Sequence, residues 1–379
     1  MPFRKTTTIA CIADNANERP AGFGYLRLFL ALGVTTWHAA MVSGQGDQFI
    51  HIVANTPWRP LLFFRLPMFF ALSGFLISAS AARCRTLISF GLLRAFRIFP
   101  ALIVEVLLSA LLLGPLMTQV RLDEYFLSGT SQAYLLSATG WIHFELPGVF
   151  TANPLPNSVN LSLWTIPVEL GCYAIMALLM VTRHLLAGRM VLILMAVMQL
   201  ALLVQLFINP ARADIIGPQL PLCFIAGTAL HLYRHRIRLH WSLAATALAI
   251  TFLLLERLGG TAVVALPIAY LTVYLGLQLP KLLPVARLGD YSYGIYLYSF
   301  PIQQMVATQS WTHKWWLNMA LSFPLALVAA IASWHLIEKG FLRLKPWVLK
   351  VERALVARLS RLTRRKTPAL KTSLPAPSR

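Results

Sequence analysis

Runs of apolar residues, separated by short polar segments, follow one another along most of the chain. A helix needs roughly 20 mostly apolar residues to cross the hydrocarbon core of a membrane, and several runs approach that length. No signal-peptide cleavage pattern precedes the first run, so we expect it to be a retained helix. The pattern predicts an all-α, polytopic integral membrane protein with about ten transmembrane helices, at residues 22–44, 61–82, 98–117, 159–182, 189–208, 214–233, 241–256, 260–279, 288–309 and 315–337.

The composition supports a membrane protein. The 379 residues are 58% hydrophobic and 12% charged, with a mean hydropathy of +0.66, whereas a soluble domain carries about 25% charged residues. This deficit excludes a soluble enzyme, a disordered protein and a collagen-like chain. The net charge of +20 would indicate nucleic-acid binding in a soluble protein, but in a membrane protein the same excess marks cytoplasmic loops.

The positions of the cations predict the topology. If the N-terminus is cytoplasmic, every inner loop is basic, and an even number of spans places both termini in the cytoplasm. The inner cations are then Arg4, Lys5, Arg19, Arg83, Arg85, Arg94, Arg97, Arg183, Arg189, Arg234, Arg236, Arg238, Lys281, Arg287, Lys339, Arg343, Lys345 and those of the C-terminal tail. The outer cations are Arg59, Arg65, Arg121, Arg212, Arg257 and Lys314.

Three regions follow from this topology: a cytoplasmic N-terminal segment (1–21), a transmembrane domain (22–345) and a basic amphipathic cytoplasmic tail (346–379). Apolar residues of the tail recur among Arg and Lys with helical spacing, which predicts a helix on the anionic inner leaflet rather than a nucleic-acid partner. The four cysteines show no paired spacing, so we expect no disulfide and no metal site. They are Cys11, Cys84, Cys172 and Cys223.

Five titratable side chains fall in or at the predicted spans, where they cost several kcal/mol and are candidates for function. They are Arg27, His38, Arg65, Glu105 and Glu169. Eleven residues separate Arg27 from His38, so in a helix they lie about 20° apart on one face and roughly 16 Å apart along the axis. One helix face thus offers a cation near its cytoplasmic end and an imidazole deeper in the bilayer.

Each of these residues also has a purely structural interpretation. His38 is equally well explained as a neutral imidazole that a neighbouring helix satisfies. Arg27 and Arg65 are also explained as cations that extend to the interface. We expect Glu105 to be a packing acid paired with a cytoplasmic arginine. Glu169 follows a proline, where a helix irregularity exposes backbone carbonyls.

Six segments, in order, resemble the acyltransferase-3 family of membrane O-acyltransferases over about residues 23–344. They are R-x10-H at 27–38, PMFFALSGFLI at 67–77, RAFRIFPAL at 94–102, LWTIPVEL at 163–170, LGDYSYGIYLYSFP at 288–301 and WHLIEKGFLRL at 334–344. The chain departs from the family pattern at Ser299, where a histidine is common, and at Gly340, where proline is common.

The resemblance implies transfer of an acyl group, usually acetyl, from cytoplasmic acyl-CoA to a hydroxyl of an extracytoplasmic or lipid-linked carbohydrate such as an exopolysaccharide or O-antigen. It also implies a multi-pass protein of the bacterial inner (cytoplasmic) membrane. Acyl-CoA is a co-substrate, and no tightly bound cofactor is expected. The family's functional residues map onto Arg27, His38, Arg94, Arg97 and Glu169.

Acyl transfer to an alcohol needs a base, and His38 is the expected general base because imidazole titrates near neutrality. A covalent acyl-histidine is the less favoured variant. Glu169 is expected to orient His38 or to stabilise its imidazolium, as a carboxylate does behind a catalytic histidine.

Two further groups complete the expected site. The guanidinium groups of Arg27, Arg94 and Arg97 are expected to bind the phosphates of CoA, because their fork geometry suits phosphate. Arg65 and Tyr293 are the candidates for contact with the acceptor.

Other classes of function remain open. A transporter would suit many spans with intramembrane charge, but it predicts inverted repeats, which the sequence does not show. The acceptor is alternatively a small molecule or a lipid. A non-catalytic scaffold leaves the intramembrane charges unexplained. The sequence does not define the oligomeric state.

Overall fold

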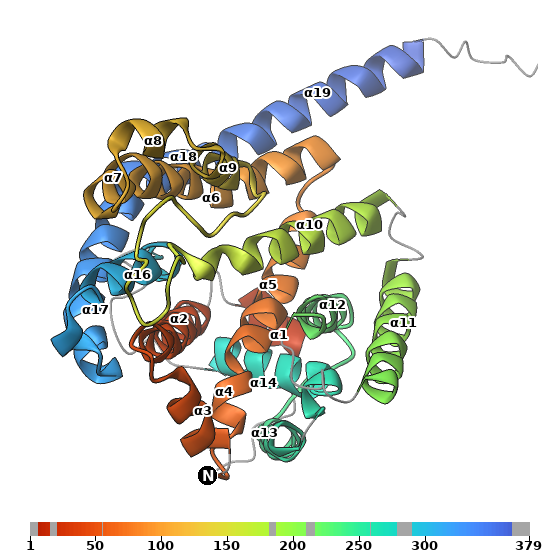
Figure 1. Cartoon of the computed structure of the whole chain (residues 1–379). Helices are drawn as coiled ribbons and strands as arrows, with labels where there is room; N and C mark the ends of the chain where they lie inside the picture. Colours follow the sequence, from red (N-terminus) through yellow and green to blue (C-terminus); the bar gives the residue numbers. More distant parts are fainter. Residues whose placement is uncertain are drawn as a thin grey trace, which may run out of the picture.

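The structure of the protein is a computed structural model that describes residues 7–15, 21–54, 56–181, 187–209, 217–257, 259–278 and 290–365. Each predicted apolar run contains a helix, and the all-α prediction is confirmed (Figure 1). These helices are α2 (Ala21–Val42), α5 (Arg65–Ala81), α6 (Leu87–Leu108), α10 (Thr165–Val181), α11 (Ala187–Ile208), α12 (Gln219–Leu232), α13 (Trp241–Glu256), α14 (Ala265–Gln278), α16 (Ser292–Val306) and α17 (Trp315–Ser333).

Among the described residues, five helical segments are long and apolar enough to cross a membrane: Gly22–Val42, Leu87–Met117, Leu161–Val181, Gly188–Ile208 and Trp315–Ala357. Helices α5, α12, α13 and α14 are apolar but shorter. These segments agree with a membrane protein, whereas the number of ten crossings and the side of the termini stay predictions. The predicted cations Arg4, Lys5, Arg19, Arg183, Arg212, Lys281 and Arg287, and residues 366–379 of the tail, lie outside the described residues.

The third apolar run begins earlier than predicted. Helix α6 starts at Leu87 rather than at residue 98, and it continues through η1 (Ser109–Leu113) and α7 (Gly114–Met117). Its N-terminus is capped by Thr86, whose side-chain oxygen accepts a hydrogen bond from the backbone N–H of Ser89. Arg94 and Arg97 interrupt the apolar pattern of this first half, which is why a hydropathy criterion misses it.

The remaining elements are short, apart from one C-terminal helix. Helix α19 (Lys345–Arg365) confirms that the tail is helical as far as Arg365. The short elements are β1 (Thr7–Thr8), α1 (Ile9–Asn15), α3 (Gly46–Ala54), α4 (Pro60–Phe63), α8 (Leu122–Leu127), α9 (Gly129–Leu136), η2 (Ser137–Thr139), η3 (Leu161–Trp164), β2 (Arg238–Leu239), η5 (Gly260–Ala262), η6 (Ser310–Thr312), η7 (Trp334–Glu338) and α18 (Lys339–Arg343). Strands β1 and β2 pair antiparallel, with Thr7 opposite Leu239.

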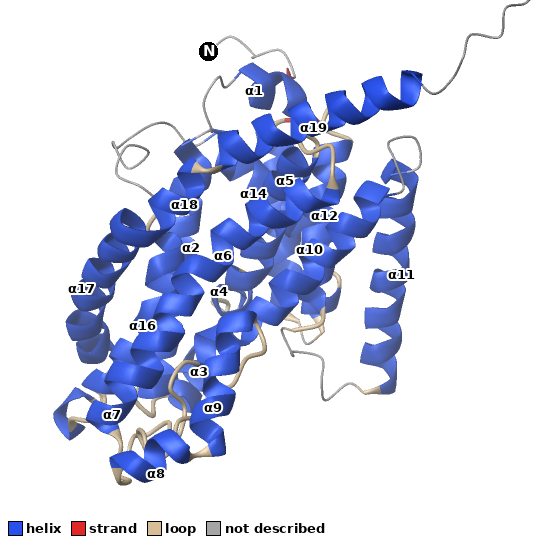
Figure 2. Cartoon of the chain, turned by 90° about the horizontal axis from the view of Figure 1, so that it is seen from above, coloured by secondary structure: helices blue, strands red, loops and turns tan. Residues whose placement is uncertain are grey.

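The helix bundle has two distinct ends. Helices α1 and α19 lie at one end, and α8 and α9 lie at the opposite end (Figure 2). We refer to them as the tail end and the loop end. Helix α19 lies across the tail end and packs against α6.

Close helix crossings hold the centre of the bundle together. Helices α5 and α12 pack at Gly74 and Gly227, where an added Cβ atom would lie 1.9 Å from the carbonyl oxygen of Phe224 and 2.0 Å from that of Ala71. Small residues at such crossings allow the backbones of membrane helices to approach closely. Helix α2 packs against α5, α14, α16 and α17, and it therefore brings the R-x10-H motif to the middle of the protein.

Candidate active site

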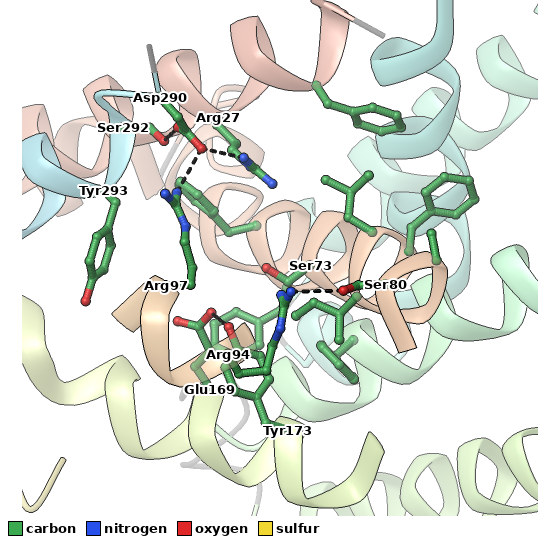
Figure 3. Close-up of a pocket in the computed structure, with 18 of the residues that line it drawn as sticks. Arg27, Ser73, Ser80, Arg94, Arg97, Glu169, Tyr173, Asp290, Ser292 and Tyr293 are labelled. Atoms are coloured by element: carbon green, nitrogen blue, oxygen red, sulfur yellow. Dashed lines mark hydrogen bonds and ion pairs between the residues drawn. The ribbon is translucent and has the colours of Figure 1, made fainter. Parts of the chain in front are cut away.

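A cavity of about 550 Å³ lies within the bundle. Its walls include residues of α2, α5, α6, α10, α12 and α16 and of the segment just before α16 (Figure 3). At the tail end it is lined by Arg83 and Lys345, and further along it by Thr165 and Tyr296. Five of the sequence-predicted site residues line it: Arg27, Arg94, Arg97, Glu169 and Tyr293.

Arg27 and Arg97 share one carboxylate, that of Asp290. The Oδ2 atom of Asp290 lies 2.6 Å from Nη1 of Arg27 and 2.8 Å from Nη2 of Arg97 (Figure 3). Arg97 also lies 3.4 Å from Oε2 of the buried Glu338, and the hydroxyl of Ser292 donates to the other oxygen of Asp290 at 2.6 Å. Two of the three arginines expected to bind phosphate are therefore already paired with carboxylates of the chain.

The sequence indicated neither of these acidic partners. Asp290 belongs to the quoted LGDYSYG segment and precedes an apolar helix, which is the available signal for it. Glu338 lies in η7, a π-helical turn at the end of α17. Such turns are frequent at functional sites, but the turn itself cannot be recognised from residue periodicity.

Arg94 has different neighbours. Its Nη2 atom donates to the hydroxyl of Ser80 at 3.0 Å, and its guanidinium lies 5.9 Å from the ring centroid of Tyr173. Within the described part of the chain, no carboxylate lies within ion-pair distance of Arg94, and its buried Nε atom has no hydrogen-bond partner. Arg94 thus forms no direct ion pair with a described carboxylate, although Glu169 on the same cavity wall is near enough to interact with its charge.

His38 lies beyond the wall of this cavity. The imidazole is 7% exposed, its Nδ1 atom lies 3.4 Å from Oγ of Ser162, and its ring packs edge-on against Phe300 with centroids 5.1 Å apart. The hydroxyl of Tyr296, which lines the cavity, donates to the backbone oxygen of Ser162 and lies 2.7 Å from Oγ1 of Thr165. Contacts from Tyr296 to Ser162 and from Ser162 to His38 therefore connect the cavity wall to the imidazole.

Arg27 and His38 both belong to α2, and both contact the chain around α16. Arg27 pairs with Asp290 just before this helix, and His38 packs against Phe300 within it. The prediction that the two residues share one helix face is confirmed.

A buried polar chain extends from Ser162 to a carboxylate. The side-chain oxygen of Asn160 accepts the backbone N–H of Ser162 at 3.2 Å, and its amide nitrogen donates to Oε1 of Glu105 at 2.8 Å. The hydroxyl of Ser109 donates to the same oxygen at 2.9 Å. The prediction that Glu105 pairs with an arginine is wrong, because amide and hydroxyl donors satisfy its Oε1 atom. The sequence did not indicate Asn160 or Ser162, since each contributes only a common polar residue without a motif spacing.

Glu169 and His38 do not meet. The hydroxyl of Tyr173 donates to Oε1 of Glu169, one helical turn away on α10, and both residues face the cavity (Figure 3). The polar contact of His38 is instead with Ser162. Of the two residues expected to form a base and its orienting carboxylate, only Glu169 lines the cavity.

The two predicted acceptor contacts, Arg65 and Tyr293, both hydrogen-bond to the backbone. The guanidinium of Arg65 donates to the carbonyl oxygens of Gly33 and Leu62, each at 2.8 Å. The hydroxyl of Tyr293 donates to that of Ile98 at 2.9 Å, while its ring lines the cavity. These hydrogen bonds join α2 to α5 and α16 to α6, so both side chains have a structural role in the bundle.

Comparison with known proteins defines the class of the enzyme. A family model described as an acyltransferase domain matches residues 21–338, which covers all the residues of the cavity that come from α2 to α16. The chain belongs to this acyltransferase-3 family, as the motifs predicted, and it is a membrane O-acyltransferase.

Two curated relatives match nearly the full length of the chain. An O-acetyl transferase of Shigella phage Sf6 is 27% identical over 343 residues, covering 84% of this chain and 95% of the relative. Nodulation protein 10 of Rhizobium leguminosarum bv. viciae is 31% identical over 375 residues, covering 87% of this chain and 96% of the relative. No solved structure matches the chain.

Proposed function

We propose that this enzyme transfers an acetyl group from cytoplasmic acyl-CoA to a hydroxyl of an extracytoplasmic or lipid-linked carbohydrate, such as an exopolysaccharide or O-antigen, in the bacterial inner membrane. The similarity to a protein named O-acetyl transferase supports acetyl as the group transferred. The basic residues gathered at the tail end support the assignment of that end to the cytoplasm.

The observation that carries the proposal is the course of the large cavity. It begins among cations at the tail end and reaches Thr165 and Tyr296, which contact each other, and Tyr296 also contacts Ser162, the partner of His38. A CoA molecule with its phosphates among the cations extends its pantetheine arm along this cavity. The thioester then approaches His38 without transfer of the whole donor across the membrane.

His38 acts as the general base in this proposal. Ser162 occupies the Nδ1 side of the ring, so Nε2 is the nitrogen that receives the proton of the acceptor hydroxyl. The hydroxyl oxygen attacks the thioester carbonyl carbon, the C–S bond breaks as the ester C–O bond forms, and the proton passes from His38 to the leaving thiolate. Atoms and charge balance without a further reactant.

The remaining predicted residues divide between donor and framework. Arg94, which forms no direct ion pair with a described carboxylate, contacts a CoA phosphate, and Glu169 is part of the wall of the donor cavity. Arg27 and Arg97 fix the segment before α16 through Asp290. A chain of hydrogen bonds from Glu105 through Asn160 and Ser162, rather than Glu169, holds the imidazole of His38.

Membranes containing the enzyme, labelled acetyl-CoA and the cells' own glycans test this function. We expect label in an envelope glycan with wild type, none with His38→Ala, and an unchanged amount with His51→Ala, an exposed histidine on α3. Full transfer by a normally inserted His38→Ala variant contradicts the base assignment. Label in a small molecule or in a lipid overturns the carbohydrate acceptor, and transport without any dependence on acetyl-CoA overturns the acyltransferase assignment.

A further inference from the structure

A second cavity, of about 360 Å³, lies at the tail end where α19 passes α5 and α6. Five cations line it, namely Arg83, Arg94, Lys345, Lys350 and Arg353. Within the described part of the chain, no Asp or Glu lines this cavity. It shares Arg83, Arg94 and Lys345 with the large cavity, so the two adjoin.

One buried carboxylate of α19 fixes the helix in this position. Glu352 is 4% exposed, and its Oε1 atom accepts hydrogen bonds from the backbone N–H groups of Arg85 and Thr86 and from the hydroxyl of Thr86, at 2.8, 2.6 and 2.8 Å. These donors precede α6, where backbone N–H groups have no partner within the helix. Lys350 and Arg353, on either side of Glu352, are therefore held over the second cavity.

The deeper part of the large cavity offers less positive charge than its arginines suggest. Arg27 and Arg97 are balanced by Asp290 and Glu338. A CoA molecule carries a diphosphate and a 3′-phosphate, and bringing these groups next to paired arginines requires either a break in the pairs or an additional source of charge. The second cavity, in contrast, has no Asp or Glu among its described lining residues, so Lys350 and Arg353 add positive charge that Asp290 and Glu338 do not balance.

We propose that the second cavity binds the 3′-phosphate end of acyl-CoA, with Lys350 and Arg353 of α19 as its ligands. The inference deepens the proposed function and rests on it, because the donor must be a CoA thioester. Two observations favour CoA over a lipid headgroup: the second cavity adjoins the cavity that leads toward His38, and it shares with that cavity the buried, unpartnered Nε of Arg94. Helix α19 follows the family match, which ends at residue 338, so this part of the donor site is outside the shared domain.

The test uses the full-length enzyme in nanodiscs of phosphatidylcholine, which contain no anionic lipid. Calorimetry measures Kd for acetyl-CoA and for its 3′-dephospho analogue with wild type, Lys350→Ala/Arg353→Ala, Lys350→Arg/Arg353→Lys and Arg343→Ala. Arg343 is an exposed cation on α18 that lines neither cavity.

The double alanine variant should raise Kd for acetyl-CoA by roughly tenfold or more, because it loses charge-assisted contacts to the 3′-phosphate. The dephospho analogue lacks this phosphate and should bind all variants alike. The charge-preserving variant and Arg343→Ala keep the wild-type Kd.

The outcomes separate the two proposals. If wild type binds acetyl-CoA and the double alanine variant binds it equally well, the assignment of the second cavity is wrong and the acyl-CoA donor stands. The measurement is repeated in nanodiscs that contain anionic lipid. A difference in Kd between wild type and the double alanine variant that occurs only there assigns the cavity to a lipid headgroup and overturns the inference. If wild type binds neither acetyl-CoA nor its analogue, the proposed donor itself is wrong.

Discussion

The Nδ1 atom of His38 lies 3.4 Å from the hydroxyl oxygen of Ser162, and both side chains are buried. Ser162 precedes α10, while His38 is near the C-terminal end of α2. The contact between this hydroxyl and Nδ1 holds the orientation of the ring and leaves Nε2 as the nitrogen that can face the acceptor. The base of the proposed reaction is thus oriented by a serine, where the sequence predicted a glutamate.

Replacing Ser162 by alanine removes this contact and leaves the imidazole of His38 free to rotate away from its position. We expect Ser162→Ala to lower kcat by about 10- to 100-fold, less than the roughly 100- to 10,000-fold that a whole general base contributes, with KM for acetyl-CoA unchanged. Initial rates with labelled acetyl-CoA over pH 6–9 measure the effect. The Ser162→Thr variant retains a hydroxyl and should keep most of the wild-type rate. Ser322→Ala, a buried serine on α17, is the control. A kcat equal to that of wild type shows that Ser162 does not position the base.

The shared carboxylate of Asp290 makes a prediction about stability. Asp290→Asn keeps the shape of the side chain and leaves Arg27 and Arg97 close together without its negative charge. Removal of one partner from a buried ion pair costs about 3–5 kcal/mol; since these side chains are 19–23% exposed, we expect about 1–3 kcal/mol. Thermal unfolding in detergent should show a lower Tm.

A double-mutant cycle gives the control for Asp290. Arg27→Gln/Asp290→Asn should be less destabilised than the sum of the two single variants, because the second change removes a charge that the first leaves unpaired. Asp123→Asn, at an exposed ion pair with Arg121, should leave Tm unchanged. Additive effects of Arg27→Gln and Asp290→Asn contradict an interaction between the two residues.

The crossing of α5 and α12 predicts which glycine tolerates a methyl group. An added Cβ at Gly74 would lie 1.9 Å from the carbonyl oxygen of Phe224, whereas at Gly91 on α6 nothing lies within 4 Å. Gly74→Ala should separate the helices and destabilise the protein by roughly 3 kcal/mol or more, seen as loss of the folded peak in detergent gel filtration. Gly91→Ala should fold as wild type does. Equal behaviour of the two variants excludes this close crossing.

The sequence predicted the helices well because apolar length is a local property. Each apolar run contains a helix, and α13 matches its predicted residues, Trp241–Glu256. The one large boundary error is at the start of α6, where Arg94 and Arg97 are polar but face an internal cavity instead of water. A hydropathy pattern does not distinguish these two environments.

The sequence predicted most of the residues that line the candidate site, but it did not predict which side chains contact one another. The motifs led to Arg94, Arg97 and Glu169, which do line one cavity. The pairing of Glu169 with His38 was inferred from chemistry alone, and the structure instead joins His38 to Ser162. Such contacts between distant segments depend on helix packing, which no spacing within the sequence encodes.

The contact between Glu352 and the start of α6 predicts how the tail helix affects the donor. Glu352→Ala removes the acceptor of three hydrogen bonds, so α19 should detach locally and the amides of Arg85 and Thr86 should exchange with deuterium at least tenfold faster. Hydrogen exchange with mass spectrometry measures this, and Glu124→Ala, at an exposed residue of α8, is the control.

Acetyl-CoA at saturation should slow hydrogen exchange in α19 of the wild-type enzyme, because its phosphate bridges the tail to Arg83 and Arg94. The same ligand should slow exchange much less in Glu352→Ala. Exchange that is unchanged by the substitution shows that Glu352 does not hold α19.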